Sequence, residues 1–352
     1  MSAAPKVAIV LFNLGGPDRP EAIRPFLLNL FRDPAIITAP WPIRALIARR
    51  IVRARLAPAT ASYEKIGGRS PLLAQTERQG KLLEAALPEL SARAFIAMRY
   101  WHPRSREAAR AVAAWEPDEI VLLPLYPHFS TTTTGSSLAD WREAAAAVGL
   151  AKPTRAVCCW YADRAFVDSL AGIVRREIAA ARAALPPGTP LRLLFSAHGL
   201  PERVVRAGDP YRMQIEATAA AVLAALGPDA PESRVCFQSR ATPEPWLAPS
   251  TDEEVRAAGV DGTALLVVPI AFVSEHSETL VELDIDYREL AARSGVPAYF
   301  RAPTPALEPL FIAALAGLVR AARGLPPGLC VLSGRGACGP AHPACPKEVA
   351  PA

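Results

Sequence analysis

A histidine at the end of an apolar run is the first candidate for chemistry in this 352-residue chain. His198 lies in the segment Ser-Ala-His-Gly-Leu-Pro, residues 196–201, directly after the apolar stretch Leu-Leu-Phe. A neutral imidazole at such a position takes up protons or binds a metal ion near pH 7. The fragment alone equally allows a strand-end histidine that is merely hydrogen-bonded in a turn.

An acidic segment at 274–287 is the second candidate. Glu275, Glu278 and Glu282 recur there at helical spacing, together with His276, and residues three or four apart share one face of a helix. Clustered carboxylates repel one another, which raises the pKa of one or more of them when they are partly buried. A solvated acidic face is the usual alternative. Because the segment directly follows an apolar strand-like run and contains a histidine, we expect it at a cleft, where acids serve as metal ligands or proton carriers.

Strand-like and helical stretches alternate along the whole chain and must position these residues. The expected strands are 7–14, 94–100, 119–124, 154–158, 191–197, 234–237, 263–269 and 298–301, and the expected helices include 21–31, 72–87, 140–148, 164–184, 211–226 and 277–293. Several strand-like runs are continuously apolar, which is typical of strands buried on both faces. The alternation therefore predicts parallel sheets covered by helices on both sides.

An internal repeat divides the chain into two similar halves. Residues 9–17 align with 193–201, and residues 120–124 align with 264–269. Each half opens with a strand, a turn and a helix. The repeat predicts an α/β fold with two similar Rossmann-like, doubly wound domains.

The expected domains are residues 1–163 and 164–328, followed by a cysteine-bearing tail at 329–352. Leu14 and His198 occupy equivalent positions in the repeat, at the carboxyl ends of the two first strands. Ligands of open α/β sheets bind outside these ends. We therefore expect the two domains to face each other across a cleft, with His198 on one wall and Leu14 on the other.

Composition and charge favour an ordinary globular protein. Hydrophobic residues make up 51% and charged residues 21% of the sequence, which excludes a disordered or fibrous chain. The longest apolar runs, such as 264–273, are well short of the ~18 residues that a membrane span needs. The N-terminus lacks the pattern of a signal peptide, so we expect a cytoplasmic protein. The formal charge of +5 allows acidic partners and requires none.

Seven ordered motifs resemble the ferrochelatases, the family that inserts ferrous iron into a porphyrin in the last step of haem synthesis. They are LFNLGGP at 11–17, YEKIGGRSP at 63–71, MRYWHP at 98–103, LYPHFS at 125–130 with TGSS at 134–137, SAHGLP at 196–201, FQSR at 237–240 and the acidic segment at 275–287. Each motif is weak alone, whereas seven in family order across essentially the whole chain are specific. The two Rossmann-like halves of that family agree with the internal repeat.

The resemblance implies roles for single residues at matching positions. It makes His198 and Glu278 the catalytic pair, a cleft histidine facing a glutamate, both in contact with the incoming iron. Glu275, His276 and Glu282 match an acidic path that leads inward from this pair. The motifs that line the porphyrin pocket contain Asn13, Leu14, Arg99, Tyr100, Tyr126 and Ser130.

The implied reaction inserts Fe²⁺ into protoporphyrin IX and gives protohaem with release of two protons. A histidine with an ordinary pKa near ~6.5 suits proton uptake, and both roles of His198, proton acceptor and iron ligand, stay open. Leu14 favours protoporphyrin, since the ferrochelatases that act on coproporphyrin carry a tyrosine there. The alternative functions are a chelatase for another tetrapyrrole or metal and a haem or metal carrier with the same fold. The intact His198–Glu278 pair speaks against the carrier.

The segment 41–53 has the pattern of a helix that lies on anionic lipid. Ile43, Leu46, Ile47 and Ile51 share one face, and arginines surround it,. A surface helix docked on its own domain has a similar pattern. The resemblance, in which this region forms an apolar lip at the pocket mouth, favours peripheral association with the inner face of the cytoplasmic membrane. Porphyrin and ferrous iron are the other expected partners, nucleic acid is not one, and a homodimer is compatible with the sequence.

Three of the six cysteines, Cys330, Cys338 and Cys345, lie in a Gly/Pro-rich tail that cannot bury much apolar surface. Thiolates held together by a metal would order such a tail. A [2Fe–2S] cluster takes four cysteines, so its fourth ligand would come from Cys158 or Cys159. From the spacing alone, a cluster, a zinc ion and reduced free thiols are equally open.

The resemblance favours the cluster, because some ferrochelatases bind a [2Fe–2S] cluster through one mid-chain cysteine and three near the C-terminus. We expect it to have a structural or redox-sensing role. Cys236, inside a strand-like run, is expected to be a buried thiol. The expected cluster ligands are Cys158, Cys330, Cys338 and Cys345, with Cys159 as the alternative to Cys158.

Overall fold

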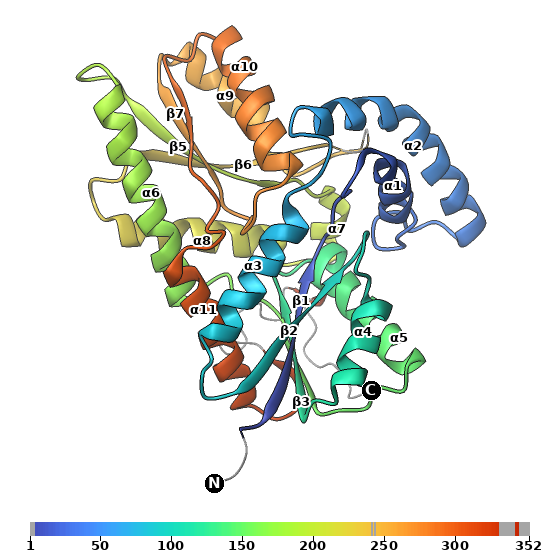
Figure 1. Ribbon diagram of the computed structural model, residues 1–352. Coiled ribbons are helices and arrows are strands. Elements are labelled where there is room, and N and C mark those ends of the chain that lie inside the picture. Colours follow the sequence, from blue (N-terminus) through green and yellow to red (C-terminus); the bar gives the residue numbers. More distant parts are fainter. Residues whose placement is uncertain (1–3, 241, 243, 331–341, 345–352) are drawn as a thin grey trace. The chain divides into compact units, whose positions relative to one another are not determined.

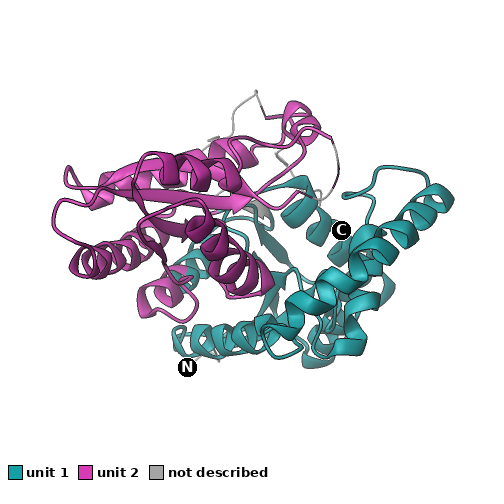
Figure 2. Cartoon of the chain, turned by 90° about the horizontal axis from the view of Figure 1, so that it is seen from above, with its two compact units in different colours: residues 1–159, 315–332, 346–352 teal, residues 160–314, 333–345 magenta. Residues whose placement is uncertain are grey.

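The computed structural model describes residues 4–240, 242, 244–330 and 342–344, and the chain forms two compact units (Figure 1, Figure 2). The first unit comprises residues 1–159, 315–332 and 346–352, and the second comprises residues 160–314 and 333–345. Helix α11, Pro309–Arg323, crosses the division, since residues from 315 onward group with the first unit. The expected division into domains at residues 1–163, 164–328 and 329–352 stays a prediction.

A five-stranded parallel sheet forms the centre of the first unit. The interior strand β1 pairs with β2 on one side and with β3 on the other, and it is apolar and buried, as expected of a parallel strand covered on both faces,. The spatial order is β2 (Ser91–Met98), β1 (Lys6–Asn13), β3 (Glu119–Pro124), β4 (Thr154–Val157) and β9 (Gly328–Cys330).

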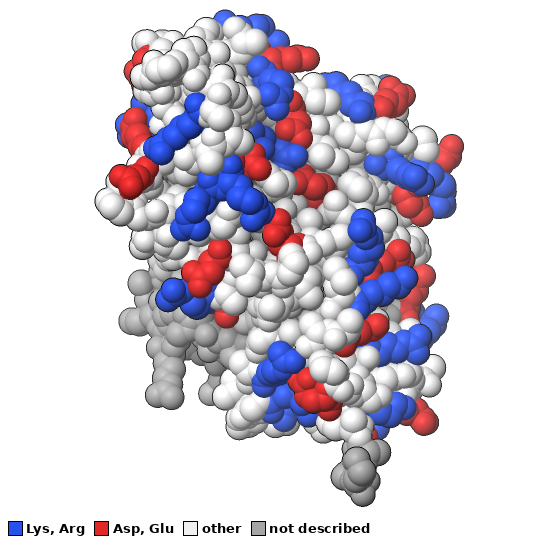
Figure 3. All heavy atoms as spheres, turned by 60° about the vertical axis from the view of Figure 1, so that its left-hand side comes forward, with Lys and Arg blue, Asp and Glu red and all other residues white. Residues whose placement is uncertain are grey.

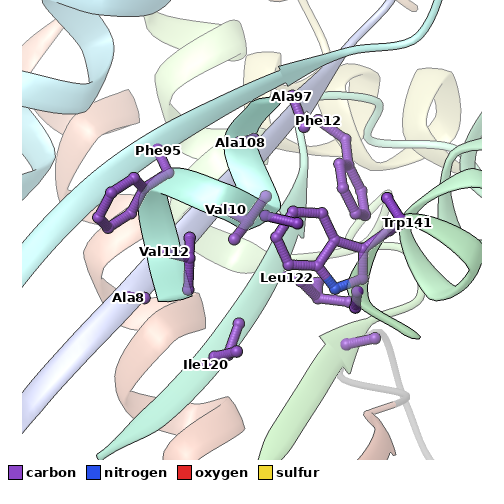
Figure 4. Close-up of a cluster of buried hydrophobic side chains, with 14 of the residues drawn as sticks. Ala8, Val10, Phe12, Phe95, Ala97, Ala108, Val112, Ile120, Leu122 and Trp141 are labelled. Atoms are coloured by element: carbon purple, nitrogen blue, oxygen red, sulfur yellow. The ribbon is translucent and has the colours of Figure 1, made fainter. Parts of the chain in front are cut away.

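Helices cover both faces of this sheet. On one face, Val10 and Phe12 of β1 pack with Val112 of α4 and Trp141 of α5 (Figure 4). On the other face α3 lies against β1 and β2, and a Cβ at Gly80 would lie only 3.0 Å from the Cβ of Ala94. The glycine therefore permits this close approach. The elements are η1 (a 3₁₀-helix, Pro20–Ala22), α1 (Ile23–Phe31), α2 (Trp41–Glu64), α3 (Leu72–Ala85), α4 (Ser105–Trp115), η2 (a π-helix, Thr131–Gly135) and α5 (Ser136–Ala147).

A four-stranded parallel sheet forms the centre of the second unit. One face packs against α9, η3 and α10 through residues such as Leu194, Val255 and Leu283, while α6 and α8 pack on each other and contact β7 and β6. The strand order is β6 (Glu232–Gln238), β5 (Leu191–His198), β7 (Ala264–Pro269) and β8 (Tyr299–Arg301). The helices are α6 (Arg164–Ala184), α7 (Glu202–Arg206), α8 (Tyr211–Leu226), α9 (Thr251–Val260), η3 (a π-helix, Glu278–Asp286) and α10 (Tyr287–Arg293).

The two sheets repeat one strand order. In each, the first strand is central, the second lies on one side of it, and the third and fourth lie on the other. This order confirms the prediction of two similar doubly wound halves. All eight predicted strands are present. The sequence pattern missed β9, because a strand of three residues is too short to show a periodic signal,.

Charged side chains of both signs are mixed on the face shown in Figure 3. Many charged side chains form ion pairs within one unit, such as Arg203 with Glu244 in the second unit and Arg320 with Glu89 in the first, both at 2.8 Å. Within the described residues, no helix combines the length and the apolar character that a membrane crossing requires.

Candidate active site

The candidate site lies at the carboxyl end of the second sheet, where the strand order reverses. β5 and β7 are neighbours, but the chain visits β6 between them. Loops that follow two such strands diverge and leave a crevice, which is the usual ligand site of an open α/β sheet. His198 is the last residue of β5, and Glu278 begins the π-helix that follows β7. The fold therefore brings the predicted catalytic pair to one edge of the sheet, at the position where such folds usually bind ligands,.

His198 and Glu278 form a direct contact. The Nδ1 atom of His198 lies 3.1 Å from Oε2 of Glu278, and the two side chains are 36% and 27% exposed. His276 approaches the same carboxylate oxygen, with its Nε2 at 3.6 Å, while its Nδ1 lies 3.2 Å from the carbonyl oxygen of Ser274. One carboxylate thus faces two imidazoles.

The contact changes the protonation of both partners. Burial lowers the pKa of His198, but the charge of Glu278 and the hydrogen bond to it outweigh burial, so the pKa lies above its ordinary value,. Burial raises the pKa of Glu278, but the charge of His198 and hydrogen bonds from His198 and His276 hold it well below its usual range. Glu278 therefore stays ionised and favours a proton on His198.

Glu282 is a second carboxyl group near this pair, and its pKa is shifted in the direction opposite to that of Glu278. Its Oε2 atom accepts hydrogen bonds from Ser239 Oγ at 2.6 Å and from Gln238 Nε2 at 3.2 Å. Burial and the nearby charge of Glu278 raise the pKa of Glu282 above its ordinary value. Two carboxyl groups with oppositely shifted pKa values are typical of sites that divide proton transfer between an acid and a base.

The helix that carries both glutamates is a π-helix over Glu278–Asp286, continued by α10. The sequence predicted a helix at 277–293, and it did not predict the wider π turn with its i→i+5 hydrogen bonds. The Glu278 and Glu282 carboxylates are nevertheless close enough for the charge of one to raise the pKa of the other. Gln238 Nε2 donates to the backbone carbonyl of Glu278 at 3.4 Å and to the Glu282 carboxylate at 3.2 Å.

Glu275, the third predicted acidic residue, has a different partner. Its carboxylate lies 3.0 Å from an NH1 nitrogen of Arg301 and accepts a hydrogen bond from the backbone amide of Thr304 at 2.9 Å. Burial raises its pKa, but the Arg301 charge and these hydrogen bonds outweigh burial and lower it.

The six predicted pocket residues lie in the first unit, at the carboxyl ends of its strands. Asn13 ends β1, and its amide donates to Thr76 Oγ1 at 3.1 Å and accepts from the Leu14 amide at 2.8 Å. Tyr126 is partly buried beside the core that α4 and α5 cover, and burial raises its pKa above the ordinary value. Ser130 caps η2, where its Oγ accepts from the backbone amide of Thr132 at 3.1 Å.

Arg99 and Tyr100 belong to a buried network around Asp33. The Asp33 carboxylate accepts hydrogen bonds from the hydroxyl of Tyr100 at 2.8 Å and of Ser136 at 2.5 Å, and it lies 2.8 Å from Arg99 NH2. Tyr100 is completely buried and Arg99 is 13% exposed. Arg99 also lies 3.4 Å from Asp140. Both side chains are therefore committed to contacts inside the unit.

Sequence reasoning missed Asp33 and Arg301 and quoted Gln238 without assigning it a role. Asp33 is 67 residues from Tyr100 and 103 from Ser136, so no local pattern announces the network. Arg301 stands 26 residues from Glu275. A signal existed only for Gln238, whose place in the quoted FQSR motif at the end of an expected strand put it next to the strand of His198.

The cysteines divide between described and undescribed parts of the chain. Cys158 and Cys159 are buried and follow β4 directly, while Cys330 ends β9. Cys338 and Cys345 lie outside the described residues. Cys236 is buried as predicted, and burial raises the pKa of its thiol to about 12. Across the described part of the chain, no three His, Cys, Asp or Glu side chains form a ready metal site.

Helix α2 exposes part of the predicted apolar face. Trp41, Ile43 and Leu46 are 59%, 54% and 58% exposed, whereas Ala48 and Val52 of the same helix are buried against α1. The first two turns of the helix thus present large apolar side chains, and the turns that carry Ala48 and Val52 are docked on the first unit.

Comparison with known proteins identifies the family. A family model described as ferrochelatase matches residues 6–323. The ferrochelatase of Phenylobacterium zucineum is 55% identical over 317 residues, which cover 88% of this chain and 90% of that protein. The ferrochelatase of Caulobacter vibrioides is 51% identical over 345 residues, 97% of each chain. SirB from Bacillus subtilis with Fe³⁺ shares the fold, with a TM-score of 0.52 and 14% identity over 90% of this chain and 95% of that chain. The chain belongs to the ferrochelatase family, enzymes that insert a metal ion into a porphyrin for haem synthesis.

Proposed function

We propose that the protein inserts Fe²⁺ into protoporphyrin IX to form protohaem, with His198 and Glu278 as its catalytic pair. The observation that carries this proposal is the 3.1 Å contact between His198 Nδ1 and Glu278 Oε2 at the switch point of the second sheet. Insertion displaces two pyrrole protons, so the reaction needs a proton acceptor beside the macrocycle and a route by which the acceptor is discharged.

The hydrogen bond to Glu278 decides which nitrogen of His198 is available. When Nδ1–H donates to the carboxylate, the lone pair of the neutral imidazole is on Nε2,. Nε2 is then the atom that takes a pyrrole proton or meets the iron. Glu278 stabilises the imidazolium that proton uptake produces, and Glu282, with its raised pKa, is suited to hold a proton passed onward,.

Anaerobic incubation with protoporphyrin IX and Fe²⁺ tests this function directly. Catalytic formation of protohaem is the expected result, and His198→Ala should nearly abolish it while the protein stays folded. Arg164→Ala is the control, because Arg164 also contacts a carboxylate, that of Asp168 at 2.8 Å, but is exposed and lies outside the seven motifs. One equivalent of bound haem without turnover would instead indicate a carrier. Faster turnover with Co²⁺ or Ni²⁺ would indicate a different metal.

The same proposal includes a [2Fe–2S] cluster bound by Cys330, Cys338, Cys345 and either Cys158 or Cys159. The backbone supports this set at one place. β4 and β9 are parallel neighbours with Val157 opposite Cys330, and adjacent strands are ~4.8 Å apart. The main chain of Cys330 therefore passes beside that of Cys158. A cluster here would tie the tail to the first sheet, and porphyrin metallation transfers no electrons through it.

A freshly purified anaerobic sample tests the cluster independently of activity. It should be red-brown, with visible charge-transfer bands and bound sulfide, and Cys338→Ser should bleach it and destabilise the protein. Cys236→Ser is the matched control, since this buried thiol donates a hydrogen bond to the Phe195 carbonyl and accepts one from the Thr251 hydroxyl inside the second unit. A colourless, iron-free and fully active preparation would rule the cluster out.

Peripheral membrane association on the cytoplasmic side completes the proposal. The exposed apolar side chains Trp41, Ile43 and Leu46 at the start of α2 support it, together with Arg49, Arg50 and other arginines along the same helix. Apolar side chains enter the interface while the arginines meet anionic headgroups. Such a helix would keep an apolar porphyrin close to the lipid in which it dissolves.

A further inference from the structure

Arg301 joins the two ends of the acidic segment. It is the last residue of β8, its side chain is 10% exposed, and it contacts two carboxylates. The Nη1 atom of Arg301 lies 3.0 Å and 3.2 Å from the two carboxylate oxygens of Glu275. The Nε and Nη2 atoms of Arg301 donate to the two carboxylate oxygens of Asp284 at 2.8 Å and 2.7 Å. The second contact is a two-point fork, the strongest and most directional form of this pair.

These two carboxylates flank the reactive ones. Glu275 lies just before the π-helix, Asp284 lies within it, and Glu278 and Glu282 stand between them in sequence. π-helices are rare and frequently occur at functional sites. Side chains outside residues 278–286 contact this segment, and the position of Glu278 relative to His198 depends on those contacts.

Strand β8 supplies much of this support. The hydroxyl of Tyr299 donates to the backbone carbonyl of Leu283 at 2.7 Å, and Arg288 NH1 donates to the Tyr299 carbonyl at 2.7 Å. From the opposite side, Gln238 of β6 holds Glu278 and Glu282. Arg301 differs from these contacts because it links the loop before the π-helix to the helix itself.

Arg301 also neutralises the charge of Glu275, a carboxylate close in sequence to the catalytic pair. Glu275 is adjacent in sequence to His276, which approaches Glu278 at 3.6 Å. A carboxylate released here would add a metal-binding group one residue from the site. While Arg301 holds it, Glu275 makes charge-assisted hydrogen bonds inside the protein and is not available to a cation,.

We propose that Arg301 is a positioning residue that fixes the π-helix of the active site and withholds Glu275 from the incoming metal ion. This deepens the proposed function, on which it rests. It replaces the expectation that Glu275 belongs to an open acidic path. Glu278 and Glu282, whose described partners are histidines and neutral side chains and not an arginine, are the carboxylates that this proposal leaves for the metal.

The test compares Arg301→Met with Arg293→Met, which is the matched control. Arg293 lies in α10, the helix that continues the π-helix, but it is 67% exposed and pairs with Glu289 at 3.6 Å. We expect Arg301→Met to raise the KM for Fe²⁺ by about 10- to 100-fold, as loss of a partner that orients metal-binding groups does. The KM for porphyrin should change much less, and Arg293→Met should change neither.

Calorimetric titration with Co²⁺ in the absence of porphyrin gives a second readout. Arg301→Met should bind additional Co²⁺ relative to the native protein, and Arg301→Met/Glu275→Gln should lose that added binding, because Glu275 is its source. A native stoichiometry in Arg301→Met, with an unchanged KM for Fe²⁺ and only a lower Tm, would show that the arginine is merely structural and would overturn the proposal.

Asp284→Asn covers the case in which Arg301→Met does not fold. It breaks one end of the link and leaves the contact with Glu275. A raised KM for Fe²⁺ is expected, and a native value would overturn the positioning role. If the native protein makes no haem at all, the proposed function fails, whereas the Co²⁺ titrations still decide whether Arg301 withholds Glu275.

Discussion

Replacing Glu278 by Gln tests the core of the proposed mechanism, because it keeps the shape of the side chain and removes its charge. His198 then loses the carboxylate that contributes most to raising its pKa, and burial, which lowers that pKa, is opposed only by the smaller effect of the Glu282 charge,. The rising limb of the pH–rate profile should move to lower pH. The maximal rate should fall by about 10²- to 10⁴-fold, the usual range for loss of a positioned acid–base group.

The effect on stability follows from the geometry of the pair. Two unit charges about 4 Å apart attract by about 1 kcal/mol in water and about 4 kcal/mol at an effective dielectric constant of 20. His198 and Glu278 are 36% and 27% exposed, so solvent screens part of this attraction. We therefore expect Glu278→Gln to lower the free energy of unfolding by about 1–3 kcal/mol where both groups are charged.

The pH dependence of this loss has a definite sign. The pKa of His198 is raised, so its contribution is fully present below the ordinary histidine value and disappears as pH rises through the folded-state pKa,. The pKa of Glu278 is lowered, so its contribution is present above the ordinary glutamate value and disappears as pH falls through the folded-state pKa. The difference between the variant and the native protein should be largest between about pH 5 and 6.5.

Thermal and urea unfolding from pH 4 to 9, together with pH–rate profiles, measures these effects. Glu308→Gln is the matched control, since Glu308 pairs with Arg176 at 2.6 Å in the same unit but far along the chain from the catalytic motif. A Glu278→Gln variant with the native profile midpoint and a pH-independent loss of stability would refute the reasoning. Glu278 would then be a packing residue and His198 would act without it.

Three further predictions concern the first unit. Asp33→Ala should lower the free energy of unfolding by about 3–5 kcal/mol in urea denaturation, because it leaves Arg99 buried without its main partner,; a loss below 1 kcal/mol would contradict that role. Protoporphyrin IX should be metallated faster than coproporphyrin III under matched conditions, and Leu14→Tyr should narrow the difference; faster native turnover of coproporphyrin III would overturn the substrate assignment. Replacing Trp41, Ile43 and Leu46 by Ala should weaken sedimentation with anionic vesicles and barely change Tm, since these side chains are more than half exposed; the reverse result would favour a docked surface helix.

Local patterns predicted the parts of the fold that depend on local sequence. The apolar runs at β1, β3, β5 and β7 are nearly continuous because these strands are buried on both faces,. Their order along the chain was enough to place His198 at a strand end. Since parallel strands of one sheet end at the same edge, the acidic segment after β7 had to lie nearby.

Contacts between distant residues could not be predicted in the same way. Glu275 and Glu278 are both glutamates and lie three residues apart in the same acidic segment. Nevertheless, Glu275 pairs with Arg301 and Glu278 pairs with His198. The difference depends on which cation the fold places opposite each carboxylate. Arg99 illustrates the same limit, because its motif suggested a pocket residue and its guanidinium is held by Asp33.

The π-helices extend the internal repeat beyond what the sequence alignment covers. In each unit a π-helix follows the third strand and continues into an α-helix, η2 into α5 and η3 into α10. π-helices are rare and frequently occur at functional sites. The π-helix of the first unit carries Thr132 and Thr134, both buried. The π-helix of the second unit carries Glu278 and Glu282. The shared fold thus supplies the same wide turn twice, and the side chains alone make one copy neutral and the other acidic.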